Sequence, residues 1–80
     1  MNIVVMTNGQ RTEVQASKSF ALHSVIPPAL EQAGYGGWAT DNWEMRLPDG
    51  TLLDTTKRIS SFKFGEGARL YLNLRAGVGG

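Results

Sequence analysis

Two stretches near the start of the chain have the composition and alternation of β-strands. Residues 2–7 are rich in β-branched side chains, and residues 11–16 alternate between apolar and polar. Between them, Asn8-Gly9 supplies the two positive-φ residues that a tight hairpin turn requires. We therefore predict a hairpin. Its core-facing residues are expected to be Ile3, Val5, Val14 and Ala16.

The next apolar residues recur at helical spacing. They are Leu22, Val25, Ile26, Ala29 and Leu30. Ser17 and Ser19 are candidate N-caps, and Gly34 is the expected stop. Pro27-Pro28 lies inside this pattern, and each proline removes a backbone donor. We predict a helix over 20–33, with a kink or a local loss of hydrogen bonds near 24–28.

Alternation returns in the second half of the chain. Residues 43–47 and 51–53 flank Pro48-Asp49-Gly50, which suits a type I turn closed by a left-handed glycine. A short loop or one-turn helix follows, carrying Ile59, Phe62 and Phe64 toward the core. A turn at 65–67 leads into a last strand at 68–75, with Leu70, Leu72 and Leu74 on one face.

This order of elements predicts an α+β domain. One helix should pack across one face of a mixed sheet of four to five strands. On the last strand, the opposite face should carry Arg69, Tyr71, Asn73 and Arg75.

Composition narrows the classes of function. The chain has 80 residues, no cysteine, a net charge of +1 and eight basic residues scattered along the sequence. It carries no cysteine nucleophile, no electrostatic footprint for nucleic acid and no apolar run that could cross a bilayer. We expect a soluble cytoplasmic domain with neither nucleic acid nor membrane as a partner.

Candidate chemistry concentrates at the carboxyl end of the sequence. Gly79-Gly80 follows a strand and an arginine, and residues without a β-carbon can pass through a narrow protein tunnel. His23, Asp49 and Asp54 belong to no acid–base or metal-ligand pattern, so we predict no catalytic residue, cofactor or metal. Trp38 and Trp43 form either a contact site or the cap of a small core.

The chain resembles ubiquitin nearly from end to end. The opening residues 1–5 are similar to the first strand of ubiquitin, and 58–75 are similar to its last third. The ending Leu74-Arg75-Ala76-Gly77-Val78-Gly79-Gly80 resembles the leucine-arginine and diglycine tail with one extra residue. The resemblance implies a β-grasp roll over 1–75, its last strand parallel to its first, and a flexible diglycine tail at 76–80. The nearest type is the bacterial ubiquitin-like proteins encoded beside conjugation enzymes.

The resemblance implies a protein modifier that is a substrate and not an enzyme. An activating enzyme would adenylate the Gly80 carboxylate, a conjugating enzyme would carry it as a thioester, and a target amine would form the isopeptide bond. A deconjugating metalloprotease is a further possible partner. The activating enzyme would recognise Leu74, Arg75, Ala76, Gly77 and Val78. For Arg75, a solvated charge at a strand end is the alternative interpretation.

The sheet surface departs from the pattern of ubiquitin. Where ubiquitin has an apolar recognition patch, the partner-facing set here is mostly polar: Met6, Glu44, Arg46, Tyr71 and Asn73. Modules that bury an apolar patch would have to desolvate these groups without partners for them, so we expect such modules not to bind. Lys18, Lys57 and Lys63 have no convincing counterparts among the chain-forming lysines of ubiquitin, which makes polymer formation doubtful.

Two other functions remain open. A sulfur carrier has the same fold and diglycine and is also adenylated, but it ends as a thiocarboxylate. A ubiquitin-like module that only binds would carry its terminal glycines incidentally. The leucine-arginine approach to the tail favours the modifier.

Overall fold

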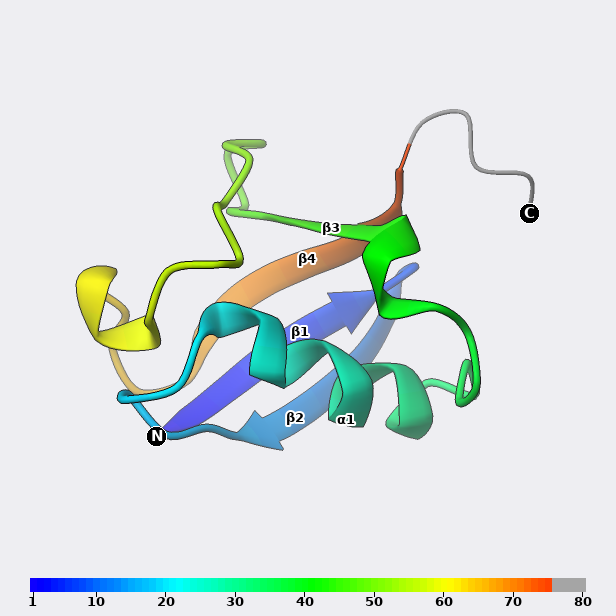
Figure 1. Cartoon of the computed structure of the whole chain (residues 1–80), viewed down its shortest axis with the longest axis horizontal. Helices are drawn as coiled ribbons and strands as arrows, with labels where there is room; N and C mark the ends of the chain where they lie inside the picture. The colour runs from blue at the N-terminus through cyan, green and yellow to red at the C-terminus, as the bar shows by residue number, and fades with distance from the viewer. Residues whose placement is uncertain (76–80) are drawn as a thin grey trace.

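Four strands form one mixed sheet in the computed structural model, which describes residues 1–75 (Figure 1). The sheet order is β2-β1-β4-β3, and β1 and β4 are parallel at the centre while both outer pairs are antiparallel. One α-helix crosses one face of the sheet (Figure 1). The elements are β1 (Asn2–Thr7), β2 (Gln10–Gln15), the 3-10 helix η1 (Leu22–Val25), α1 (Ile26–Gln32), the 3-10 helix η2 (Thr40–Asn42), β3 (Trp43–Arg46), the 3-10 helix η3 (Ile59–Ser61) and β4 (Ala68–Leu74).

The first hairpin is confirmed. Asn8 and Gly9 have φ values of 52° and 87°, so both central residues of the turn occupy the left-handed region. The register pairs Ile3 with Val14, which places both side chains on the core face. The predicted parallel pairing of the first and last strands is confirmed as well.

The helix prediction is wrong in its first half. The α-helix begins at Ile26, and residues 22–25 form the 3-10 helix η1. The two prolines fall in the first turn of α1, where their missing N–H groups have no intrahelical acceptor to lose. The expected loss of regular hydrogen bonding near 24–28 is therefore a junction between two helices.

The predicted serine caps are also wrong. Ala21 precedes η1 and Val25 precedes α1, and neither helix start has a side-chain cap. The hydroxyls of Ser17 and Ser19 lie 3.0 Å apart and bond each other instead.

The predicted end of the helix is confirmed. Gly34 has a φ of 89°, and its N–H donates to the Glu31 carbonyl at 3.2 Å. The Tyr35 N–H donates to the Leu30 carbonyl at 2.8 Å. These two bonds form a Schellman motif, which directs the chain from the helix into the loop that carries Trp38.

The second hairpin is confirmed as a turn but not as a pair of strands. Gly50 has a φ of 91°, and its N–H donates to the Leu47 carbonyl at 2.9 Å. The returning segment makes a single bridge, Arg46 to Leu52, so no fifth strand forms within residues 1–75. The last strand ends at Leu74, one residue earlier than predicted.

The core lies between the sheet and the helical segments. Its buried side chains come from every strand and from η1, α1 and η3: Ile3, Val5, Val14, Leu22, Val25, Ile26, Ala29, Leu30, Trp43, Met45, Ile59, Leu70 and Leu72. Across the described residues 1–75, no helix has the length and apolar character needed to cross a bilayer.

Candidate functional site

The end of β4 is held against the turn that precedes β3. The Arg75 backbone N–H donates to the Asn42 carbonyl at 2.8 Å, and its guanidinium Nε–H donates to the Asp41 carbonyl at 2.7 Å. Leu74 is half-buried and pairs with Trp43 across the β3–β4 ladder. The chain therefore leaves the sheet from a defined point beside η2.

Of the residues expected to guide an activating enzyme, Leu74 and Arg75 lie together at this point. The others, Ala76, Gly77 and Val78, lie outside the described residues, as do Gly79 and Gly80. The hydrogen bond from Arg75 to the Asp41 carbonyl was missed by sequence reasoning. It joins residues 34 positions apart, and no local pattern signals it.

An aromatic cluster occupies the same end of the molecule. The ring centroids of Tyr35 and Trp38 are 5.2 Å apart, and those of Tyr35 and Trp43 are 5.1 Å apart, both edge-to-face. Asn8 donates to the Tyr35 hydroxyl at 3.1 Å, so the first hairpin turn supports the cluster. We call this region the aromatic end, made of Tyr35, Trp38, Trp43, Leu74 and Arg75.

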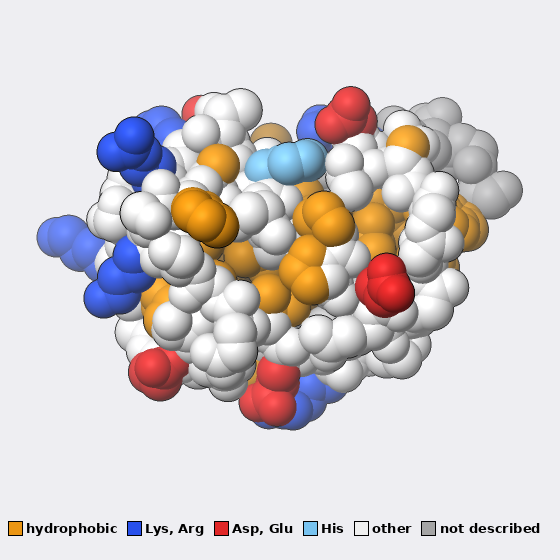
Figure 2. Space-filling model, turned by 60° about the horizontal axis from the view of Figure 1, so that its bottom comes forward, with side chains coloured by type: hydrophobic (Ala, Val, Ile, Leu, Met, Phe, Trp, Pro, Cys, Tyr) orange, Lys and Arg blue, Asp and Glu red, His pale blue; other side chains and the backbone are white. Residues whose placement is uncertain are grey.

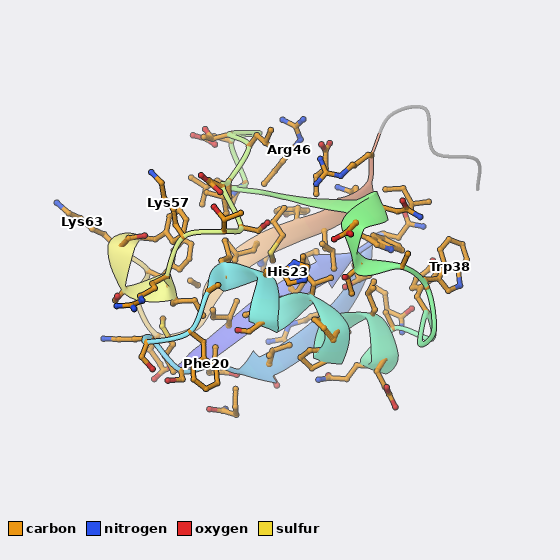
Figure 3. The ribbon with its side chains drawn as sticks, in the orientation of Figure 1. Phe20, His23, Trp38, Arg46, Lys57 and Lys63 are labelled. Atoms are coloured by element: carbon orange, nitrogen blue, oxygen red, sulfur yellow. The ribbon has the colours of Figure 1, made fainter. Side chains whose placement is uncertain are left out.

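The two tryptophans have different environments. Trp43 is 1% exposed and belongs to the core, whereas Trp38 is 42% exposed and lies at the edge of the molecule (Figure 3). The sequence left two interpretations for the tryptophans, a contact site and the cap of a small core. For Trp43, the cap of a small core fits. Its indole N–H has no hydrogen-bond partner among residues 1–75. The contact-site interpretation for Trp38 stays a prediction.

The five residues expected on the sheet surface share one face. Met6 and Arg46 both pair with Tyr71, and Glu44 pairs with Asn73. Each alternates with buried neighbours that point into the core. The face is mostly polar, and its role in binding stays a prediction.

Arg46 is held on that face by several hydrogen bonds. Its guanidinium contacts the Glu44 carboxylate at 3.1 Å and donates to the Gly50 carbonyl at 2.7 Å. These bonds join β3 to the turn that follows it. A receptor that buried this face would have to desolvate a charge pair that is already satisfied.

Two aspartates outside these surfaces accept hydrogen bonds from residues close in the sequence. The Asp49 carboxylate accepts from the Thr51 N–H at 2.9 Å, and the Asp54 carboxylate accepts from the Thr56 hydroxyl and N–H. The Thr51 side chain, and then its backbone N–H, lower the pKa of Asp49. The bonds from the Thr56 hydroxyl and N–H lower the pKa of Asp54, and the charge of Lys57 lowers it further.

His23 lies in η1 and not in the α-helix, with its Nε2 3.5 Å from the Thr40 hydroxyl. Within residues 1–75 the structure contains neither a ligand-sized pocket nor a cluster of side chains that could hold a metal.

The chain is a small α+β domain whose central strands are parallel. Its described residues form surfaces but no ligand-sized pocket. Comparison with known proteins places it in a family. The model of a family described as "Protein of Unknown function (DUF2604)" matches residues 1–80, and the chain belongs to this family.

A relative is known in Sinorhizobium fredii (strain NBRC 101917 / NGR234). The chain is 41% identical over 80 residues to its uncharacterized protein y4jI, and the match covers 100% of the chain. It covers 62% of that protein, so the chain spans less than two thirds of the length of this curated relative.

Proposed function

We propose that this chain is a ubiquitin-like protein modifier with a β-grasp fold. The order of elements supports this fold: a hairpin, a helix on one face, a second hairpin turn, a 3-10 helix and a last strand parallel to the first. The resemblance of 58–75 to the last third of ubiquitin adds to it. The proposal makes the chain a substrate of other enzymes.

One observation carries the proposal: the strand that leads toward the diglycine is central in the sheet, and its end is fixed to the body. The two hydrogen bonds of Arg75 hold the start of the last segment beside η2. The six residues from Arg75 to Gly80 can reach at most about 20 Å, which is enough to enter a deep active site while the domain stays outside. A defined starting point also limits how much of the chain the enzyme must order.

The chemistry proposed for this end is acyl transfer. The Gly80 carboxylate attacks the α-phosphorus of ATP, which forms an acyl-adenylate and releases pyrophosphate. A thiolate of the activating enzyme displaces AMP, and the resulting thioester passes to a conjugating enzyme. A target amine then attacks the carbonyl, forms an amide and releases the thiol. The thiols belong to the partners, because the chain has no cysteine.

Intact-mass measurement tests the proposal directly. The chain ending at Gly80 is incubated with its adenylating enzyme, ATP and a cell extract, beside a variant that lacks Gly80. Adducts on the enzyme and on target proteins that vanish with the deletion are expected. Exchange of one carboxylate oxygen for sulfur would instead identify a sulfur carrier, and an unchanged mass would identify a module that only binds.

The sheet surface gives the modifier its own recognition properties. We propose that modules built for the apolar patch of ubiquitin do not bind this face, because Arg46 and Glu44 would lose water there. Titration of such a module against the labelled chain, followed by NMR, provides the test. Saturable shifts on the sheet face that disappear in an Arg46→Ala, Tyr71→Ala variant would overturn this part of the proposal.

A further inference from the structure

Basic residues that are scattered in the sequence are gathered at one end of the fold. Lys18, Lys57, Arg58 and Lys63 are four of the eight Lys and Arg residues of the chain. Figure 2 shows Lys and Arg side chains gathered toward the left of the molecule, with exposed hydrophobic side chains beside them. In Figure 3, Lys57, Lys63 and Phe20 lie toward this end, away from Trp38. We call this region, Lys18, Phe20, Lys57, Arg58 and Lys63, the basic end.

Backbone hydrogen bonds give the basic end a fixed shape. Two segments lie antiparallel there: the Ile59 N–H donates to the Phe20 carbonyl at 2.9 Å, and the Ser60 N–H donates to the Lys18 carbonyl at 2.9 Å. An isolated bridge joins Ala21 to Arg58. The backbone that carries these side chains is therefore held in place within the fold.

The charges of the basic end have no ion-pair partners among the described residues. The two salt bridges within residues 1–75 are Arg11 with Glu13 and Arg46 with Glu44, both outside this end. The Asp54 carboxylate is near enough to Lys57 for that charge to lower its pKa, but the two form no salt bridge. Thr56 bonds the Asp54 carboxylate, and the Asn2 backbone N–H donates to the Glu66 carboxylate.

An exposed apolar ring lies on the same pair of segments as these cations. Phe20 is 60% exposed, the largest exposed fraction among the large hydrophobic side chains of the described residues. Its backbone is anchored on both sides, since its N–H donates to the Ser17 carbonyl at 3.1 Å and its carbonyl accepts from Ile59. A solvent-exposed aromatic ring on a rigid backbone is suited to be the anchor of an interface.

We propose that the basic end is a docking surface for an acidic segment of a partner protein that carries an apolar side chain. The carboxylates of the segment would face Lys18, Lys57, Arg58 and Lys63, and its apolar side chain would cover Phe20. This surface is separate from the carboxyl terminus. The inference is therefore independent of the proposed acyl transfer.

The charges favour a protein segment over a nucleic acid. The whole chain has a net charge of +1 and a pI of about 8.2, so the field beyond this end is weak. Nucleic-acid binding at physiological salt rests on many phosphate contacts made by a strongly basic surface. Four cations and one exposed apolar ring at the same end match a short peptide with a few carboxylates better.

The test uses a fluorescein-labelled peptide in which a central Phe-Leu pair is flanked on both sides by glutamates. Anisotropy gives its affinity for the full chain, and ¹⁵N–¹H spectra locate it. We expect amide shifts concentrated at 18–22 and 57–63. Lys57→Glu should weaken binding about five- to tenfold, and Phe20→Ala about tenfold. Raising the salt concentration should weaken it as well.

Matched controls make each outcome decisive. Arg11→Glu makes the same charge change at an exposed residue outside the basic end and should leave the affinity unchanged. A peptide with glutamines in place of the glutamates should not bind. Absent binding of the acidic peptide, equal binding of both peptides, or an equal loss with Arg11→Glu would overturn the inference. So would tighter binding of a single-stranded oligonucleotide of equal charge or of anionic vesicles.

Discussion

The two ends of this domain use their cationic side chains in opposite ways. At the aromatic end, Arg75 donates from its backbone and its side chain to carbonyls of the same molecule, beside a cluster of packed rings. At the basic end, four cations and an exposed ring meet no ion-pair partner among the described residues. The first arrangement positions a segment of the chain, and the second is suited to meet another molecule.

The largest difference between the ends should appear in stability. Trp43→Ala removes a core side chain that is 1% exposed and should lower the free energy of unfolding by about 3–5 kcal/mol. Phe20→Ala removes a ring that lies mostly in water and should change it by less than about 0.5 kcal/mol. Urea unfolding followed by circular dichroism measures both. Similar losses for the two variants would mean that the two ends are not distinct in packing.

The next largest effect concerns the proposed adenylation of Gly80. Arg75→Ala should lower the rate of ATP–pyrophosphate exchange by about ten- to a hundredfold, because a hydrogen bond from a charged donor contributes about 1.5–3 kcal/mol. Lys63→Ala, at the basic end, should leave the exchange rate unchanged.

Arg75→Lys separates a role of the charge of this residue from a role of its side-chain placement. Lysine keeps the charge but cannot reproduce the placement of the guanidinium Nε–H against the Asp41 carbonyl. Recovery of the exchange rate in this variant would show that charge alone matters there, whereas a persistent loss supports positioning.

A smaller loss of stability is expected when Arg46, the cation on the sheet face, is replaced. Arg46→Ala breaks a partly exposed ion pair with Glu44 and should cost about 0.5–1 kcal/mol of stability. Lys57→Ala removes a cation without such a partner and should cost less. The difference between the two variants should shrink in high salt. A salt-independent difference would point to the hydrogen bond from Arg46 to the Gly50 carbonyl instead.

The smallest effect is a pH dependence near the basic end. Because hydrogen bonds from Thr56 lower the folded-state pKa of Asp54, its contribution to stability is present above the unfolded-state pKa. That contribution is lost as the pH falls through the lower folded-state value. Asp54→Asn should therefore be less stable than the parent near neutral pH, and the gap should close below about pH 4. Urea midpoints at several pH values provide the measurement, and a gap that widens in acid would contradict the sign.

Local backbone chemistry determined the parts of the fold that the sequence predicted well. Asn8-Gly9, Gly34 and Gly50 all adopt positive φ at the predicted turns and helix end, because this conformation depends on the residue itself more than on its surroundings. The alternation along β4 likewise predicted which of its side chains are buried. The start of α1 was less predictable, because prolines tolerated in a first turn look the same in sequence as prolines that break a helix.

The chain by itself thus determined its turns and its strand faces. Only the tertiary structure decided that Arg75 bonds a carbonyl 34 residues away, that a bridge joins Ala21 to Arg58, and that basic residues distant in sequence share one surface. The physical reason is the distance along the sequence over which each kind of interaction acts. Backbone preference acts over a few neighbouring residues, whereas these contacts exist only after the sheet has brought distant segments together.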